Sequence, residues 1–252
     1  MRQTIKIKTF IAVVMLIAFA SCSKDYTDTT SITTVDLSKQ VFVKVFSATT
    51  GATRNYVYLP TPTSFIPLSG GTALAYGGTM PATSTYFAIN EGQNSILIKD
   101  TLSTTTQAQI FTVATLTRGK YYSLFTYDTT VSIKTKLVED NIVVPTDTTA
   151  RLRFANFVRS GSAIPNFDIY SKNLNANIYT NVALNDVTAF IPYASNVSDS
   201  LYIRSTGTST NVIGMSITPA PKRSYTILFR GRYDATGTSP TVPRTLTTFT
   251  SY

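Results

Sequence analysis

The sequence predicts an all-β protein made of two similar β-sandwiches that follow one another along the chain. Two observations predict this fold. Short β-branched and aromatic runs recur, separated by Gly, Pro, Asn, Asp and Ser, and the chain beyond the N-terminal segment shows no convincing helical periodicity over eleven or more residues. The runs of the second half also align with those of the first.

The N-terminus has the three parts of a secretory signal. Basic residues without an acid open the chain, an apolar run follows, and small residues precede Cys22, the single cysteine. The apolar run is about half the ~20 residues that a membrane-spanning helix needs. Phe19-Ala20-Ser21-Cys22 resembles the lipobox of bacterial lipoproteins, with Phe19 in place of the usual Leu. The resemblance implies removal of residues 1–21 and attachment to the membrane through acyl chains on Cys22; an ordinary secretory signal is the alternative.

The composition excludes several classes of chemistry. The chain has no His and one Cys, so Ser-His-Asp and Cys-His catalysis and zinc sites built on His or Cys are excluded. Phosphate-binding glycine motifs are also missing. Only two Glu exist, Glu91 and Glu139, which leaves little for paired-carboxylate catalysis. We therefore expect no enzyme, no metal and no cofactor.

The formal charge of +9 comes from scattered basic residues. Lys44, Lys99, Lys134 and Lys136 alternate with apolar neighbours, which is the pattern of a strand that shows its charges to water. The densest group contains Lys222, Arg223, Arg230 and Arg232. A solvated strand face is the favoured interpretation of this group, with an anion site as the alternative. An exported chain is not expected to bind nucleic acid.

The predicted strands fall into two sets of five. Those of the first half are 41–48, 85–89, 94–99, 109–116 and 120–127, and those of the second half are 151–157, 188–193, 200–205, 211–217 and 224–231. The two sets align at offsets close to the ~100 residues of an immunoglobulin-like sandwich. QVFVKVFSA (40–48) aligns with TARLRFANF (149–157), and ILIK (96–99) with LYIR (201–204). Tyr122 falls on Tyr225.

Segment 150–231 resembles domain of unknown function 4397, a family of immunoglobulin-like β-sandwich repeats found in tandem in lipoproteins of Bacteroidota. The resemblance is carried by ARLRFANF, NFDIY, TAFIPY and KRSYTILF in the second half, while NYVYLPTPTSFIPL (55–68) of the first half lacks the Asp of NFDIY. It implies the fold and the location, and no activity. The domains expected are a lipoprotein signal peptide (1–21), a flexible Thr/Ser/Asp-rich tether (22–39), and two β-sandwiches (40–144 and 145–252).

The pattern of this family singles out two polar residues, Asn156 and Asp168. They are candidate ligand contacts, with a structural role in strand ends and turns as the favoured alternative. Asp-Thr and Asp-Ser sequences also resemble the O-glycosylation motif of the same phylum. The candidate acceptors are Thr29, Thr101, Thr129, Thr148 and Ser200.

In the second half, alternation predicts which side chains form the core. Leu152, Phe154, Leu201, Ile203, Tyr225 and Ile227 are expected to point inward. Arg151, Arg153 and Arg204 are expected to face solvent. Phe154→Ala is accordingly expected to destabilise the protein strongly, and Arg153→Ala to have little effect.

The function that these observations favour is a non-catalytic binding or adhesion module for glycan or protein, anchored in the outer membrane and displayed at the cell surface rather than facing the periplasm. Aromatic side chains exposed on a sandwich face would favour binding. The candidates are Tyr58, Phe65, Tyr86 and Tyr202. A structural spacer or assembly subunit is the alternative, and an enzyme is a distant third.

Overall fold

A computed structural model describes residues 36–252, apart from 61–64, 69–71, 84, 93–94 and 236–241. The predicted all-β class is confirmed. In the described part the helical content is one short 3₁₀ turn, η1 (Leu37–Lys39), and seventeen strands make up the regular structure. Residues 36–252 form one compact unit.

The first nine strands form two sheets built from residues 40–140. The inner sheet has the order β4-β1-β8-β9, with β5 also paired to β1, and the outer sheet has the order β3-β2-β6-β7. The strands are β1 (Gln40–Ser47), β2 (Asn55–Pro60), β3 (Phe65–Pro67), β4 (Thr79–Met80), β5 (Phe87–Asn90), β6 (Ser95–Asp100), β7 (Ile110–Val113), β8 (Tyr121–Tyr127) and β9 (Lys134–Asp140).

Residues 150–250 form a second pair of sheets. The inner sheet has the order β13-β10-β16-β17 and the outer sheet has the order β12-β11-β14-β15. The strands are β10 (Ala150–Arg159), β11 (Phe167–Ser171), β12 (Ala176–Val182), β13 (Ile191–Tyr193), β14 (Asp199–Ser205), β15 (Asn211–Ile217), β16 (Ser224–Arg232) and β17 (Thr245–Thr250).

Each pair of sheets encloses its own hydrophobic core. In the first sandwich, valines of β1 and β2 pack with isoleucines of β6 and with Leu124 of β8. In the second, Leu152 and Phe154 of β10 pack with Leu201, Ile203 and Ile227. Tyr225 is partly buried against the same core. The six inward positions predicted for the second half are therefore confirmed.

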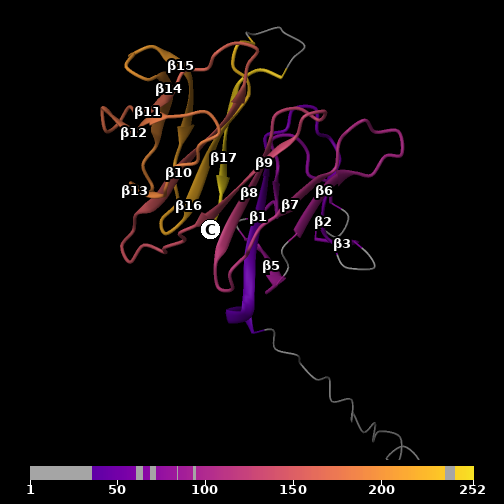
Figure 1. Cartoon of the computed structure of the whole chain (residues 1–252). Coiled ribbons are helices and arrows are strands. Elements are labelled where there is room, and N and C mark those ends of the chain that lie inside the picture. The colour runs from indigo at the N-terminus through magenta and orange to yellow at the C-terminus, as the bar shows by residue number, and fades with distance from the viewer. Residues whose placement is uncertain (1–35, 61–64, 69–71, 84, 93–94, 236–241) are drawn as a thin grey trace, which may run out of the picture. The chain divides into compact units, whose positions relative to one another are not determined.

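The inner sheets of the two sandwiches pack against each other (Figure 1). The central pairs, β1 with β8 and β10 with β16, are parallel. Their outward side chains form a third core cluster made of Phe46, Ala48, Phe125, Ala155, Phe157 and Leu228. We call this contact the junction. The junction explains why most residues of β1 and β10 are buried, including the charged residues Lys44 and Arg153.

The alignment of the two halves has a structural counterpart in their tyrosines. Val43 of β1 pairs with Tyr122 of β8, and Leu152 of β10 pairs with Tyr225 of β16. In both cases the tyrosine hydroxyl accepts a hydrogen bond from the backbone N–H five residues earlier, from Thr117 at 3.1 Å and from Ala220 at 2.9 Å. The same hydrogen bond, from a backbone N–H to a tyrosine hydroxyl, therefore occurs near the start of both parallel strand pairs.

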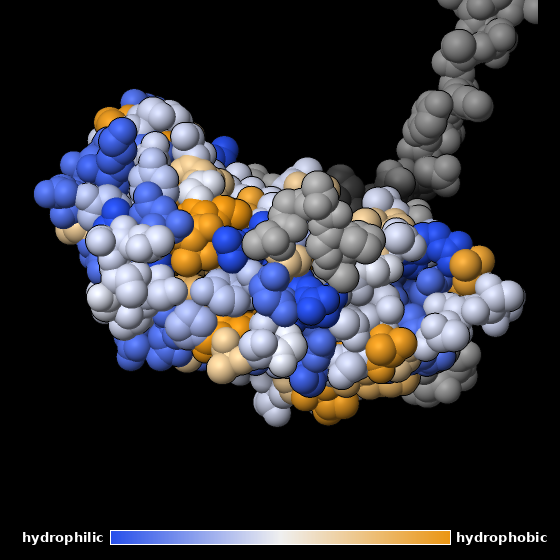
Figure 2. All heavy atoms as spheres, turned by 90° about the horizontal axis from the view of Figure 1, so that it is seen from above, coloured by the Kyte–Doolittle hydropathy of each residue, from blue (hydrophilic) through white to orange (hydrophobic). Residues whose placement is uncertain are grey.

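The described surface has scattered apolar residues. On the face shown in Figure 2, hydrophobic side chains form several small patches between hydrophilic ones. Within the described residues, no helix has the length and apolar character required to cross a lipid bilayer.

Candidate functional site

The junction buries two cations, and this corrects the sequence analysis. Arg153 is 1% exposed and Lys44 is 0% exposed. Both were expected to face solvent, because they alternate with core residues on their strands. Both are absent from the hydrophobic cores of their own sandwiches. Arg153 is covered by residues of the first sandwich, whereas Lys44 contacts the backbone of Thr83 and Thr85 in its own sandwich. Arg151 and Arg204 are half-buried.

Arg153 and Asp140 form an ion pair across the junction, from β10 to β9. The Arg153 guanidinium also donates to Ser123 Oγ at 2.6 Å and to Thr226 Oγ1 at 2.8 Å. Asp140 accepts further hydrogen bonds from Ser123 Oγ at 2.6 Å and from the Tyr86 hydroxyl at 2.8 Å. Every charged atom of the pair thus has a partner, which is the condition under which a buried ion pair is tolerated.

Lys44 holds the equivalent position in the first sandwich. Its Nζ donates to the carbonyl oxygens of Thr83 and Thr85, the latter at 3.2 Å. Burial lowers the pKa of Lys44 to about 8, and the charge of Asp140 opposes that shift. In the parallel pairs Lys44 stands beside Ser123, and Arg153 stands beside Thr226. The network joins the two sandwiches. Arg153 and Asp140 also line a hollow of about 270 Å³, but their side chains are at most 2% exposed and paired with each other, so we assign the network a structural role.

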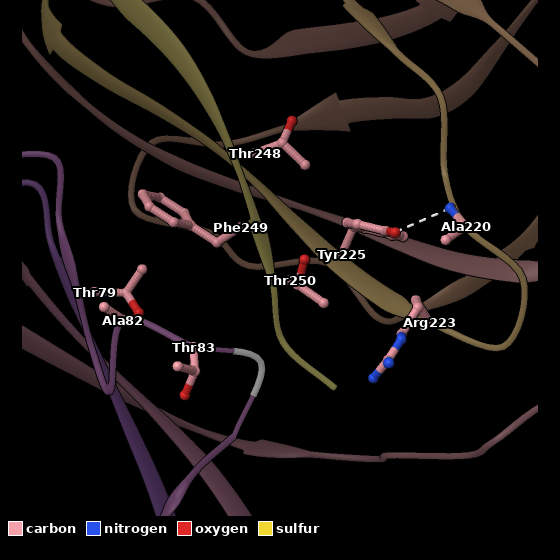
Figure 3. A pocket seen from close by; sticks show the side chains of 9 residues that line it. All are labelled: Thr79, Ala82, Thr83, Ala220, Arg223, Tyr225, Thr248, Phe249 and Thr250. Atoms are coloured by element: carbon pink, nitrogen blue, oxygen red, sulfur yellow. Dashed lines mark hydrogen bonds between the residues drawn. The ribbon is translucent and has the colours of Figure 1, made fainter.

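A polar cleft of about 470 Å³ lies beside the junction, between the β4 segment and β17 (Figure 3). Threonines line much of it, and Phe249 and Tyr225 supply its aromatic walls. Figure 3 shows Arg223 at one end, away from Phe249 and Thr79. The residues are Thr79, Ala82, Thr83, Ala220, Arg223, Tyr225, Thr248, Phe249 and Thr250. The cleft offers hydroxyls and one exposed guanidinium, which suits a polar ligand and supplies no general base.

The outer sheet of the first sandwich carries an aromatic surface on its exposed side. Tyr58, Leu97 and Phe111 stand side by side on β2, β6 and β7. Phe111 is 54% exposed, whereas Leu97 is 0% exposed although it lies on the same side. The Lys99 ammonium lies 5.3 Å from the Tyr58 ring centroid, and Tyr56 lies beside Tyr58. We call this surface the first aromatic face.

The outer sheet of the second sandwich repeats the arrangement. Tyr170 of β11 stands beside Tyr202 of β14, which stands beside Gly214 of β15. Arg204 lies two residues beyond Tyr202, as Lys99 lies two beyond Leu97, and its guanidinium carbon is 3.5 Å from the Tyr170 ring centroid. A Cβ at Gly214 would lie only 2.6 Å from the Tyr202 ring, so glycine lets this ring lie over the neighbouring strand. We call this surface the second aromatic face.

The four aromatic residues that were candidates for an exposed binding surface lie in different places. Tyr58 and Tyr202 lie on the two aromatic faces, half-buried. Tyr86 does not belong to a binding surface, because its hydroxyl donates to Asp140 and its ring packs edge-on against Tyr121. The position of the Phe65 side chain lies outside what the structure describes. Phe111 was missed, since a single Phe in a Thr-rich run carries no signal of exposure.

Asn156 and Asp168 both have structural partners. Asp168 accepts hydrogen bonds from the Asn181 backbone N–H at 2.8 Å, from Thr206 Oγ1 at 2.9 Å and from Asn177 at 3.1 Å. These contacts close the irregular pairing of β11 with β12. Asn156 is buried and donates to the carbonyl of Ala183 at 3.0 Å. This is the turn-closing alternative named in the sequence analysis.

The glycosylation candidates lie in different settings. Thr101 and Thr148 are exposed, and Thr129 and Ser200 are half-buried. Ser200 is in the middle of a paired strand, since its backbone faces Ser216 of β15. Thr29 and the lipidation candidate Cys22 lie outside the described residues. Among the residues that the structure describes, no three His, Cys, Asp or Glu side chains gather to hold a metal.

The family described as Domain of unknown function (DUF4397) matches residues 41–164. This segment covers the first sandwich and β10, whereas the stronger resemblance was expected over residues 150–231. No curated protein matches the chain. The chain is similar to the solved structure of CBMbc (family CBM26) from Eubacterium rectale Amy13K in complex with maltoheptaose, at 11% identity and a TM-score of 0.25. The likeness covers 82% of this chain and 96% of that chain, and at this TM-score it does not bear on what this chain binds.

Proposed function

We propose that this chain is a non-catalytic glycan-binding protein of the bacterial cell envelope, anchored through acyl chains on Cys22. The lipobox-like sequence supports the anchor, and the aromatic faces support the binding role. Placement in the outer membrane, with display at the cell surface, follows from the resemblance of the N-terminus and of the repeats to Bacteroidota lipoproteins.

The observation that carries the proposal is the repetition of one surface in both sandwiches. Each outer sheet places a tyrosine on one strand and a cation on the next, at matching positions: Tyr58 with Lys99, and Tyr170 with Arg204. A fold alone does not require this, because outward positions of an exposed sheet tolerate most polar residues. Flat aromatic rings bind the apolar C–H face of a sugar ring, and nearby charged groups bind its hydroxyls.

The positions of the two faces indicate how the protein works. The outer sheets flank the paired inner sheets on opposite sides (Figure 1). One flat ligand therefore does not contact both faces, and each face binds a separate chain. A protein with two such faces on a firmly packed junction bridges two glycan strands, or bridges the cell surface to an external glycan.

The test is a glycan array probed with the chain from residue 36 onward, followed by calorimetry on the strongest ligand. Phe111→Ala removes the most exposed ring of the first face, and Gly214→Ala displaces Tyr202 on the second. We expect each variant to lose about half of the bound ligand per protein molecule. Thr148→Ala, at an exposed position away from both faces, is the control. Unchanged stoichiometry in both face variants would refute the proposal.

A structural spacer is the second candidate, and the junction favours it. Two sandwiches that share a buried ion pair and a third core cluster form a stiff unit, as a spacer requires. The array separates the two functions, because a spacer retains no glycan at any concentration tested.

A further inference from the structure

Two arginines and a tyrosine meet at one end of the junction. The Arg230 guanidinium carbon lies 4.3 Å from the Tyr76 ring centroid, and its Nη2 donates to Thr247 at 2.9 Å. On the paired strands β10 and β16, Arg159 lies two residues beyond Phe157, which pairs with Arg230. Burial raises the pKa of Tyr76, and the charges of Arg230 and Arg159 oppose that rise. Gly77 gives Arg230 its room, since a Cβ there would lie 2.5 Å from Arg230 Nη2.

These three residues leave hydrogen-bond donors unused. In the described part of the chain, seven buried side-chain nitrogen or oxygen atoms have no hydrogen-bond partner. Three of the seven belong to this one cluster: Tyr76 Oη, Arg159 Nε and Arg230 Nε. Buried polar atoms in folded proteins are nearly always paired, and an unpaired one costs about 1–3 kcal/mol. A concentration of them at one place points to a missing partner.

Asp128, which lines a hollow together with Arg159, and Asp234, four residues beyond Arg230, already have other partners. Asp234 is paired with Arg232 at 2.7 Å, and Asp128 is paired with Lys134 at 2.9 Å. Arg159 also lines a hollow of about 320 Å³ that contains Lys134 and Tyr127. Within the described residues, neither Arg159 nor Arg230 forms an ion pair with a carboxylate, so the cluster keeps an excess of positive charge.

We propose that Tyr76, Arg159 and Arg230 form a binding site for an oxyanion, in the form of a phosphate group. Guanidinium groups bind phosphate oxygens through charge-assisted hydrogen bonds, and a tyrosine hydroxyl adds a third donor. The site combines Tyr76 of the first sandwich with two residues of the second. It is separate from the aromatic faces and from Arg223 in the cleft of Figure 3. A bound phosphate strengthens the junction.

The experiment uses the full-length chain in mild detergent, with inorganic phosphate and with glucose 6-phosphate, and with sodium chloride at the same ionic strength. Thermal unfolding and calorimetry report binding. We expect phosphate to raise the melting temperature and chloride to have no such effect. A response to the sugar phosphate alone identifies an esterified group as the ligand, and an equal response to both identifies the free phosphate group as sufficient.

Variants locate the site. Arg159→Gln is expected to weaken phosphate binding at least tenfold, whereas Arg223→Gln, an exposed arginine outside the cluster, leaves it unchanged. In the part of the chain that the structure describes, the Tyr76 hydroxyl has no hydrogen-bond partner. Tyr76→Phe should therefore keep the melting temperature without phosphate and bind phosphate several-fold more weakly. This variant keeps the test valid if Arg159→Gln does not fold. Stabilisation that chloride reproduces, or that survives in both Tyr76→Phe and Arg159→Gln, overturns the proposal.

Discussion

Arg153 and Asp140 form an ion pair between the two sandwiches, and neither side chain is more than 2% exposed. Asp140 belongs to the last strand of the first sandwich and Arg153 to the first strand of the second. The pair therefore adds a polar link to the apolar cluster that joins the two sandwiches. Its guanidinium lies over the rings of Phe125 and Phe190.

Removal of Arg153 should destabilise the protein strongly. Arg153→Ala leaves the Asp140 carboxylate buried without its cation, which typically costs about 3–5 kcal/mol. Arg118→Ala is the control, because Arg118 is exposed and its distant pairing with Glu91 contributes little. Urea denaturation of residues 36–252 measures both. Equal midpoints for the two variants would show that the junction does not contribute to stability.

Phe154→Ala should be as costly as Arg153→Ala, at about 3–5 kcal/mol, because its ring is 0% exposed in the second core. Two neighbouring residues of β10 then both stabilise the protein, Phe154 in the second core and Arg153 at the junction. A silent Phe154→Ala variant would contradict the register of β10.

We expect the contribution of Lys44 to the free energy of unfolding to increase at alkaline pH. The pKa of Lys44 is about 8 in the folded protein and near the ordinary lysine value of 10.5 in the unfolded chain, so the unfolded chain binds more protons between these pH values. Folding stability attributable to Lys44 therefore increases as pH rises from about 8 to 10. The difference in unfolding free energy between the wild type and Lys44→Met should grow over this range. A constant difference would show that Lys44 has an ordinary pKa.

The anchor is tested on Cys22 directly. Metabolic labelling with a fatty-acid analogue should label the wild type, and Cys22→Ala should abolish both the label and membrane fractionation. Labelling that survives the substitution would mean that Cys22 is not the lipidated residue.

The sequence predicted where strands occur better than which of their faces are buried. All ten predicted runs overlap strands, because β-branched and aromatic residues alternate in them. Seven of the seventeen strands in the described part lie outside those runs: β2, β3, β4, β9, β11, β12 and β17. In β17, TLTTFT, threonines on both faces hide the alternation. Lys44 and Arg153 were assigned to solvent because alternation describes one sheet at a time. Alternation does not show that another part of the fold, a loop for Lys44 and the other sandwich for Arg153, covers the polar side of the sheet.

The candidate site was predicted only in part. Tyr58 and Tyr202 were named as aromatic candidates, but their cations were not linked to them, because Lys99 and Arg204 are paired with the tyrosines only across strands. The cluster at Tyr76 was not predicted either. Tyr76 and Arg230 are far apart in the chain, and only the packing of the two sandwiches brings them together.

Bridging of glycan-coated beads tests the central claim most directly, namely that the two aromatic faces bind separate glycan chains. Beads coated with the strongest ligand from the array are mixed with residues 36–252, and their aggregation is followed by light scattering. The wild type should aggregate the beads; Phe111→Ala and Gly214→Ala should each bind them without aggregation, and the double variant should not bind. Aggregation by both single variants, or undiminished binding by the double variant, would contradict the account.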